Sequence, residues 1–237
     1  KNYAQLFDNF ATNNGGAMFI EKGNVSISSS NFGSAQQSSN GNIATNGGAI
    51  YNAKTEVEDE YVSLNVTKIT SSKFAWNNAT FGGALYNVGT VALKKNSFGL
   101  SDKAKNKYSN SAQSGGAIYN IGTLTDSSST FAYNNATENG GAIYNEGNIL
   151  SYDKKGNISG GLNSSKFNEN SSQSGGAIYN VGNIGLSKSK FTANSAENGG
   201  AIYNDTSAQS TIISSNFVQN TATLGGAIYN NGDITLN

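Results

Sequence analysis

The chain has 237 residues, a formal net charge of zero, and neither Cys nor His. The lack of Cys excludes disulfides and thiolate metal ligands, and the lack of His removes the commonest metal ligand and general base. All basic residues are Lys, so the guanidinium group that usually recognises phosphates and base edges is missing. We therefore expect no nucleic-acid partner, no metal and no cofactor.

The two ends of the chain carry no targeting or membrane-spanning signal. The first residues, Lys1 to Gln5, do not have the composition of a secretion signal. A run of about 18 apolar residues, which a membrane helix needs, is not present in the sequence. We expect residues 1–237 to be a single repeat segment, an internal fragment of a longer surface protein whose membrane anchor lies elsewhere.

A six-residue motif beginning with Gly-Gly recurs along the whole chain. Six copies read Gly-Gly-Ala-Ile-Tyr-Asn, one reads Gly-Gly-Ala-Leu-Tyr-Asn and the first reads Gly-Gly-Ala-Met-Phe-Ile. The Gly pairs begin at positions 15, 47, 82, 115, 140, 175, 199 and 225. The shortest intervals define a unit of about 24 to 26 residues, a period typical of solenoid proteins.

Each unit contains two further elements in a fixed order. A short segment with alternating apolar residues, such as 88–93 or 181–186, has the pattern of a β-strand. A Phe-x-x-Asn motif follows, and its clean copies lie at 74–77, 131–134, 167–170, 191–194 and 217–220. The unit therefore predicts three short strands, at Ala-Ile-Tyr, at the apolar segment and around the Phe.

Three strands per unit without tight hairpin signals predict a parallel β-helix of seven to eight coils. Equivalent strands would stack at about 4.8 Å, so equivalent residues would form ladders. We expect Phe ladders inside the helix and Asn at corners, because Asn tolerates left-handed backbone and its amide can bond along the stack. The Gly pair would mark a corner where a side chain clashes or a positive φ is needed.

Insertions lengthen four of the units. Those at 53–68 and 152–161 precede the Phe, and those at 33–41 and 99–107 follow it. We expect loops at two edges of the rod, where solenoids often bind their partners. The acidic run in the first of them (Glu56, Glu58, Asp59 and Glu60) could hold Ca²⁺, but a solvated charged loop is the preferred interpretation.

The combination of Gly-Gly-Ala-Ile with Phe-x-x-Asn resembles the polymorphic outer membrane protein repeat of chlamydial surface autotransporters and other bacterial surface proteins. The resemblance implies a right-handed β-helical passenger segment, anchored at the outer membrane, exposed on the cell surface and adhesive in virulence. It assigns adhesion to both tetrapeptides, which here include Gly47, Gly48, Ala49, Ile50, Gly140, Gly141, Ala142, Ile143, Phe74, Asn77, Phe191 and Asn194. The chain departs from the pattern at Met18 and Leu85, and it lacks the Cys residues that chlamydial members often carry.

A row of Tyr residues is the candidate binding surface. Strand alternation places the Ile and Asn of the motif on one face and its Ala and Tyr on the other. If Ile and Asn point inward, an exposed aromatic stripe results, which could bind a host-cell protein receptor or a surface glycan. Alternatively, Tyr stacking only maintains the register between coils, or the Tyr residues lie inside. The stripe comprises Tyr51, Tyr86, Tyr119, Tyr144, Tyr179, Tyr203 and Tyr229, with Phe19 in the same position.

The predicted function is that of a bacterial cell-surface adhesin segment. One alternative is a passive spacer that presents a distal domain, and another is a polysaccharide-active enzyme. The carboxyl groups are scattered over different repeat positions, unlike the paired carboxylates of glycosidases, so we expect no enzyme and no catalytic residue. These carboxyl groups belong to Asp126, Glu138, Asp153, Glu169, Glu197, Asp205 and Asp233.

Overall fold

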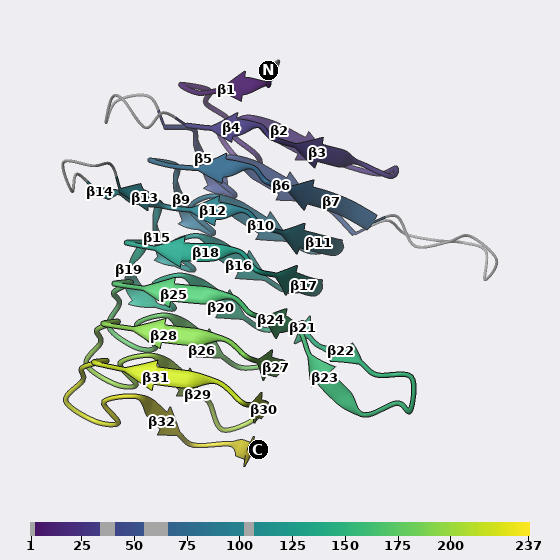
Figure 1. Cartoon of the computed structure of the whole chain (residues 1–237). Coiled ribbons are helices and arrows are strands. Elements are labelled where there is room, and N and C mark those ends of the chain that lie inside the picture. The colour runs from purple at the N-terminus through teal and green to yellow at the C-terminus, as the bar shows by residue number, and fades with distance from the viewer. Residues whose placement is uncertain (1–2, 34–40, 55–65, 102–106) are drawn as a thin grey trace.

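The computed structural model describes residues 3–33, 41–54, 66–101 and 107–237. The described chain consists of short β-strands, most of them parallel, that wind in successive coils from the N-terminal to the C-terminal end of a stack (Figure 1). Apart from two small antiparallel pairs in insertions, each described strand pairs with its equivalent one coil away and not with the next strand in sequence. The predicted parallel β-helix is therefore confirmed.

The Gly-Gly-Ala-Ile-Tyr-Asn motif forms one eight-stranded parallel sheet, which we call the Tyr sheet. Its strands are in exact sequence register, so that Ile118, Tyr119 and Asn120 lie opposite Ile143, Tyr144 and Asn145. The strands are β2 (Met18–Ile20), β6 (Ile50–Asn52), β10 (Leu85–Asn87), β16 (Ile118–Asn120), β20 (Ile143–Asn145), β26 (Ile178–Asn180), β29 (Ile202–Asn204) and β32 (Ile228–Asn230).

The alternating apolar segments form the next sheet along each coil, the aliphatic sheet. Its strands are β3 (Ser26–Ser28), β7 (Val66–Thr70), β11 (Thr90–Lys94), β17 (Thr123–Ser127), β21 (Asn148–Ile149), β24 (Leu162–Asn163), β27 (Asn183–Ser187), β30 (Gln209–Ile213) and β33 (Asp233–Leu236). Strands β21 and β24 share one coil, because the insertion at 152–161 separates them. That insertion forms an antiparallel hairpin of β22 (Ser151–Tyr152) and β23 (Ile158–Gly160), which projects from the stack (Figure 1).

The strands around the Phe residues form the third sheet of the coils, which has eight strands and which we call the Phe sheet. Its strands are β1 (Gln5–Leu6), β4 (Asn31–Phe32), β8 (Lys73–Phe74), β12 (Ser97–Phe98), β18 (Thr130–Ala132), β25 (Lys166–Asn168), β28 (Lys190–Thr192) and β31 (Asn216–Val218). Phe32 and Phe98 keep their places in the ladder although their Phe-x-x-Asn motifs are interrupted, because both insertions begin after the Phe. Near the second of these insertions, β13 (Leu100–Ser101) and β14 (Lys107–Tyr108) form a small antiparallel pair.

A fourth sheet, shorter than the other three, closes the coils between the Asn and the Gly pair, where no strand was predicted. Four coils form strands here, and later coils keep only isolated bridges such as Ser171 with Ser195. The prediction of three strands per coil is therefore wrong for this side. The segment is short and rich in Asn, Ser and Thr, so it lacks the apolar alternation that identifies a strand in sequence. The strands are β5 (Ile43–Asn46), β9 (Asn78–Phe81), β15 (Ser111–Ser114) and β19 (Asn135–Asn139).

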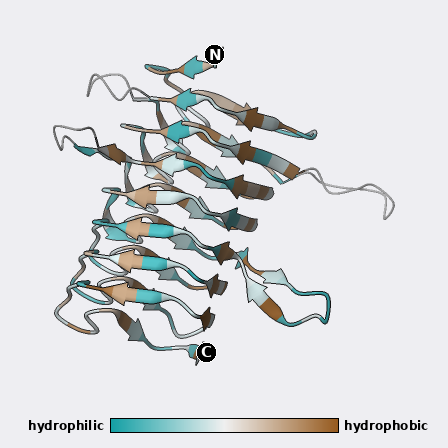
Figure 2. Cartoon of the chain, in the orientation of Figure 1, coloured by the Kyte–Doolittle hydropathy of each residue, from teal (hydrophilic) through white to brown (hydrophobic). Residues whose placement is uncertain are grey.

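The core is built from stacked ladders of the same residue type. The rings of Phe32, Phe74, Phe98, Phe131, Phe167 and Phe191 are fully buried. Neighbouring ring centroids along the ladder lie 4.6 to 4.9 Å apart in nearly parallel planes. Hydrophobic residues accordingly recur in the strands of successive coils, whereas the hairpin tip is hydrophilic (Figure 2). The predicted interior Phe ladder is confirmed.

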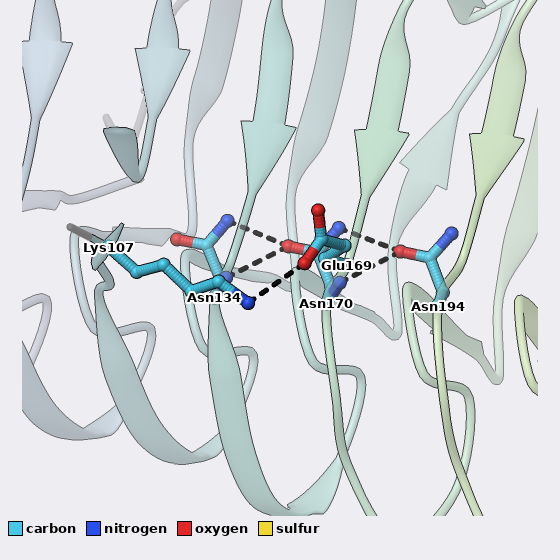
Figure 3. A network of polar contacts seen from close by, with 5 residues as sticks. All are labelled: Lys107, Asn134, Glu169, Asn170 and Asn194. Carbon is cyan, nitrogen blue, oxygen red and sulfur yellow. Dashed lines mark hydrogen bonds and ion pairs between the residues drawn. The ribbon is translucent and has the colours of Figure 1, made fainter. Parts of the chain in front are cut away.

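Two buried Asn ladders hold the corners. In the ladder of the Phe-x-x-Asn motif, the Nδ2 group of each Asn donates to the Oδ1 atom of the next Asn at 2.8 to 3.0 Å. Asn134, Asn170 and Asn194 show this arrangement in Figure 3. The second ladder, in the Tyr sheet, has the same bonds at 2.7 to 3.0 Å. The amides therefore bond along the stack, as expected.

The left-handed backbone lies one residue before the Asn, not at the Asn itself. The residues that adopt it are Trp76, Tyr133, Glu169, Ala193 and Gln219, with φ between 51° and 62°. The expectation that Asn takes this conformation is therefore wrong. The chain turns before the Asn, and the amide is left buried where it can meet its neighbours.

The two Gly residues of each pair serve different purposes. The first, such as Gly140, adopts a φ of 63°, which L side chains rarely adopt. The second, such as Gly141, would place a Cβ atom 2.2 Å from the carbonyl oxygen of Gly176 in the next coil. A Cβ atom on Gly140 would also lie 2.2 Å from the carbonyl oxygen of Ile143. Both predicted reasons for a glycine corner therefore apply: a side chain would clash at either residue, and the first also needs a positive φ.

Candidate binding surface

The seven Tyr residues of the motif form a continuous outward-facing stripe along the Tyr sheet. The Ile and Asn on either side of each Tyr point into the core, and the Tyr side chains are half-buried. Neighbouring ring centroids are 4.5 to 5.3 Å apart with interplanar angles of 4° to 20°. Phe19 extends the stack, with its ring 5.3 Å from that of Tyr51. The alternative with the Tyr residues inside does not describe this structure.

Stacking covers the ring faces. Each ring between two neighbours has a ring on both sides at van der Waals distance, so only its edge and its hydroxyl group reach solvent. Sugar rings and cations bind to free aromatic faces, which the interior of this stripe does not offer. The stripe is therefore chemically a row of phenol hydroxyls and ring edges.

Ala does not share the exposed face of Tyr, contrary to the expected alternation. Ala49, Ala142 and Ala177, for example, are fully buried. The strand begins only at the following Ile, so the Ala belongs to the corner that the Gly pair forms, where strand alternation does not hold. The small Ala side chain fills the inside of that corner.

Two carboxylates accept hydrogen bonds from the stripe. The Tyr119 hydroxyl donates to Oε1 of Glu146 at 2.6 Å, and the Tyr179 hydroxyl donates to Oδ2 of Asp205 at 2.6 Å. Glu146 and Asp205 both follow the Asn of the motif, one coil beyond the Tyr they bind. These pairs were not predicted, although the shared position of the two carboxylates after the motif is visible in the sequence.

The environment of the stripe raises the pKa of several of its hydroxyls. Partial burial, with the nearby Glu146, raises the pKa of Tyr144 to about 12. Burial, followed by the hydrogen bond to Glu146, also raises the pKa of Tyr119. Partial burial acts to raise the pKa of Asp205, but hydrogen bonds from Tyr179 and Thr206 hold that pKa below its ordinary value. At neutral pH the Tyr179 hydroxyl is therefore a neutral donor to the ionised carboxylate of Asp205.

The twelve residues to which the family resemblance assigns adhesion are all buried. The Gly, Ala and Ile residues build the corners and the floor of the Tyr sheet, and Phe74, Asn77, Phe191 and Asn194 lie in the core ladders. In the folded chain these side chains cannot touch a partner. A direct contact by the two motifs would have to be made by their outward residues, such as the Tyr.

Asp126 is buried in the aliphatic sheet, at an inward position opposite Leu93 and Leu162. Its carboxyl group accepts hydrogen bonds from the Ser165 hydroxyl at 2.6 Å, from the Ser129 amide at 3.1 Å and from the Ser129 hydroxyl. Burial raises the pKa of this carboxyl above its ordinary value. Asp126 is thus part of the packed interior and not of a surface site.

An open groove of about 440 Å³ lies between the β22–β23 hairpin and strands β27, β30 and β33. Asn183, Gln209 and Asp233, which are in register on these strands, line it together with Ile158 of the hairpin. Among the described residues that line the groove, Asp233 alone carries a carboxyl group. The described residues contain no group of three or more Asp or Glu that could hold a metal ion, and the acidic run Glu56, Glu58, Asp59 and Glu60 lies outside them.

Three segments match the family model of the Chlamydia polymorphic membrane protein repeat. The matched residues are 128–146, 164–181 and 188–205. Each segment runs from the corner before the Phe sheet to the residue after the Tyr-sheet strand, and so contains both motifs. The resemblance that the motifs predict is therefore confirmed at these repeats. Neither a curated protein nor a solved structure matches the chain, and no helix in its described part could cross a membrane.

Proposed function

We propose that the chain is a surface-exposed segment of a bacterial cell-surface protein and that it attaches the cell to host cells or to other surfaces. The observation that carries the proposal is the match of three coils to the polymorphic membrane protein repeat. Its partner would be a host-cell protein receptor or a surface glycan. A part of the protein outside these residues would tether it to the outer membrane.

The architecture is compatible with this function. Each coil adds the same outward positions at a fixed spacing, so the rod offers long rows of side chains on each side. Apart from the outward Tyr, the recurrent Gly, Ala, Ile, Phe and Asn residues of the motifs lie in the core, and the other outward residues vary from coil to coil without disturbing it. Such a surface can contact a large partner at several points.

A passive spacer is the second candidate, and the geometry of the Tyr stripe favours it. Stacked ring faces stabilise neighbouring coils, and the hydroxyls of Tyr119 and Tyr179 are already bonded to carboxylates of the same chain. Both the stacking and the internal hydrogen bonds would be expected of Tyr residues that only maintain the register between coils. In that case another part of the protein would bind the partner.

Binding of the chain alone separates the two candidates. Purified residues 1–237, labelled fluorescently, would be applied to host cells, matrix proteins and a glycan array. Saturable binding that unlabelled chain displaces supports the adhesin. Absence of binding to all three supports the spacer, and turnover of a polysaccharide in the same samples would establish the enzymatic alternative.

A further inference from the structure

The charges of the chain are segregated although their sum is zero. Six lysines gather where the aliphatic sheet passes into the Phe sheet, in the stacked segments 70–73, 94–97, 127–130, 163–166 and 187–190, which we call the Lys corner. These segments contain no acidic residue. The lysines are Lys73, Lys94, Lys95, Lys166, Lys188 and Lys190.

The segments of the Lys corner lie directly above one another. In the Phe sheet, Lys73 lies opposite Ser97, Thr130 lies opposite Lys166, and Lys166 lies opposite Lys190. Backbone bonds continue the stack at the turn, where the Ser71 amide donates to the Lys94 carbonyl at 2.9 Å. Five coils at about 4.8 Å each make a strip of about 19 Å along the axis.

The six lysines are exposed, and none of them forms an ion pair within the described residues. Lys107 is different, because its Nζ atom contacts Oε2 of Glu169 at 2.8 Å (Figure 3) and lies over the ring of Tyr133. Unpaired cations one coil apart repel each other and create a positive potential along the strip. An anionic chain that runs along the axis would relieve this repulsion.

The side chains between the lysines favour a polysaccharide. Ser97 and Thr130 occupy the Lys positions of two coils, and hydroxyls can bond to sugar hydroxyls. The corner has no aromatic residue for base stacking and the chain has no Arg for base edges. It also lacks the large apolar residues that insert into a membrane.

We propose that the Lys corner binds a linear anionic polysaccharide, sulfated or carboxylated, that lies along the helix axis. The proposal names a ligand class for the proposed adhesin function. It rests on that function only if the polysaccharide belongs to a host cell. The zero net charge, which contributed to the expectation of no nucleic-acid partner, does not exclude this binding. The binding comes from the local arrangement of charge and not from its total.

Heparin is the probe for this proposal. The variant Lys166→Gln/Lys188→Gln/Lys190→Gln removes three charges of the corner, and Lys22→Gln/Lys154→Gln/Lys155→Gln removes three exposed charges elsewhere. Affinity for heparin in low salt should fall about tenfold or more in the corner variant, and the salt dependence of binding should weaken. The control should change less than about twofold, and equal thermal melts would show that both variants are folded.

Equal losses in both variants, or full binding by the corner variant, would overturn the proposal. Stronger competition by single-stranded DNA than by heparin of equal charge would overturn the ligand class. Cells whose polysaccharide sulfation is blocked separate the two proposals. If these cells bind both the chain and the corner variant normally, the adhesin function is supported and the proposal for the Lys corner is wrong. If the chain binds heparin but no cells, the proposal for the Lys corner is supported and the adhesin function is wrong.

Discussion

At the scale of single residues, the fold depends on side chains that are small or fully hydrogen-bonded. Gly141 lies against the backbone of the next coil, where even a methyl group has no room. Asn134 donates to Asn170 Oδ1 at 3.0 Å and to the Phe98 carbonyl at 2.9 Å, and it accepts from Asn110. A side chain at Gly141 would push the coils apart, and loss of the Asn134 amide would leave buried polar groups unpaired.

Gly141→Ala should lower the free energy of unfolding by about 3 kcal/mol, because the new Cβ forces the coils to shift. The control is Gly156→Ala in the hairpin, where no atom lies near the added group and only the positive φ of 82° opposes it. That change should lower stability by about 1 kcal/mol. Chemical denaturation measures both, and similar losses would refute the close approach at Gly141.

Asn134→Ala should lower the free energy of unfolding by about 3 kcal/mol, because several buried groups lose their partners. The adjacent Asn135 is exposed, and among the described residues its side chain only accepts a hydrogen bond from the Ser171 hydroxyl. Its replacement by Ala should have an effect within about 0.5 kcal/mol. Equal melting temperatures for the two variants would show that the Asn ladder contributes little.

Asp126→Asn tests the buried carboxyl through its pH dependence. Below the ordinary pKa of 3.8 the carboxyl is neutral in both states. As pH rises above this value, the unfolded chain ionises first, and the stability that the carboxyl contributes is lost towards the raised pKa of the folded state. The stability of the variant relative to the original chain should therefore increase from acid to neutral pH, and a difference independent of pH would contradict the assignment.

At the scale of elements, the ladders connect one strand to its equivalent in the next coil. The sequence allowed the Phe ladder and the outward Tyr row to be predicted, because both follow from residues at fixed offsets on alternating strands. The fourth sheet could not be predicted, since its polar segments carry no alternation. The left-handed residues before Asn could not be predicted either, because Trp76, Glu169 and Ala193 share a backbone angle but no side-chain chemistry.

Phe191→Ala should lower the free energy of unfolding by about 3–5 kcal/mol. Its ring lies between those of Phe167 at 4.6 Å and Phe217 at 4.7 Å, and it is fully buried. Tyr203→Phe is the matched change on the outer stripe, where stacking is kept and only a hydroxyl is lost, and it should be nearly neutral. A small effect at Phe191, seen by denaturation, would place this ladder at the surface.

At the scale of the whole molecule, the chain is a stack of coils that have no separate cores. The coil count followed from the Gly pairs, and the stacking followed from their regular order. The Lys corner and the carboxylates beside the Tyr stripe could not be predicted from composition. A net charge of zero does not say which charged residues become neighbours, because the insertions differ in length and the register between coils decides that. The candidate surface could therefore be located from the sequence, but its chemistry needed the register between coils.

The register itself is the central claim, and engineered disulfides test it most directly because the chain has no Cys of its own. Asn183 lies opposite Gln209 one coil on, and Gln209 lies opposite Asp233. Asn183→Cys with Gln209→Cys should oxidise completely, since neighbouring strands at about 4.8 Å are within disulfide range. Asn183→Cys with Asp233→Cys, two coils apart at about 10 Å, should remain reduced in the monomer. The opposite pattern would contradict in-register stacking.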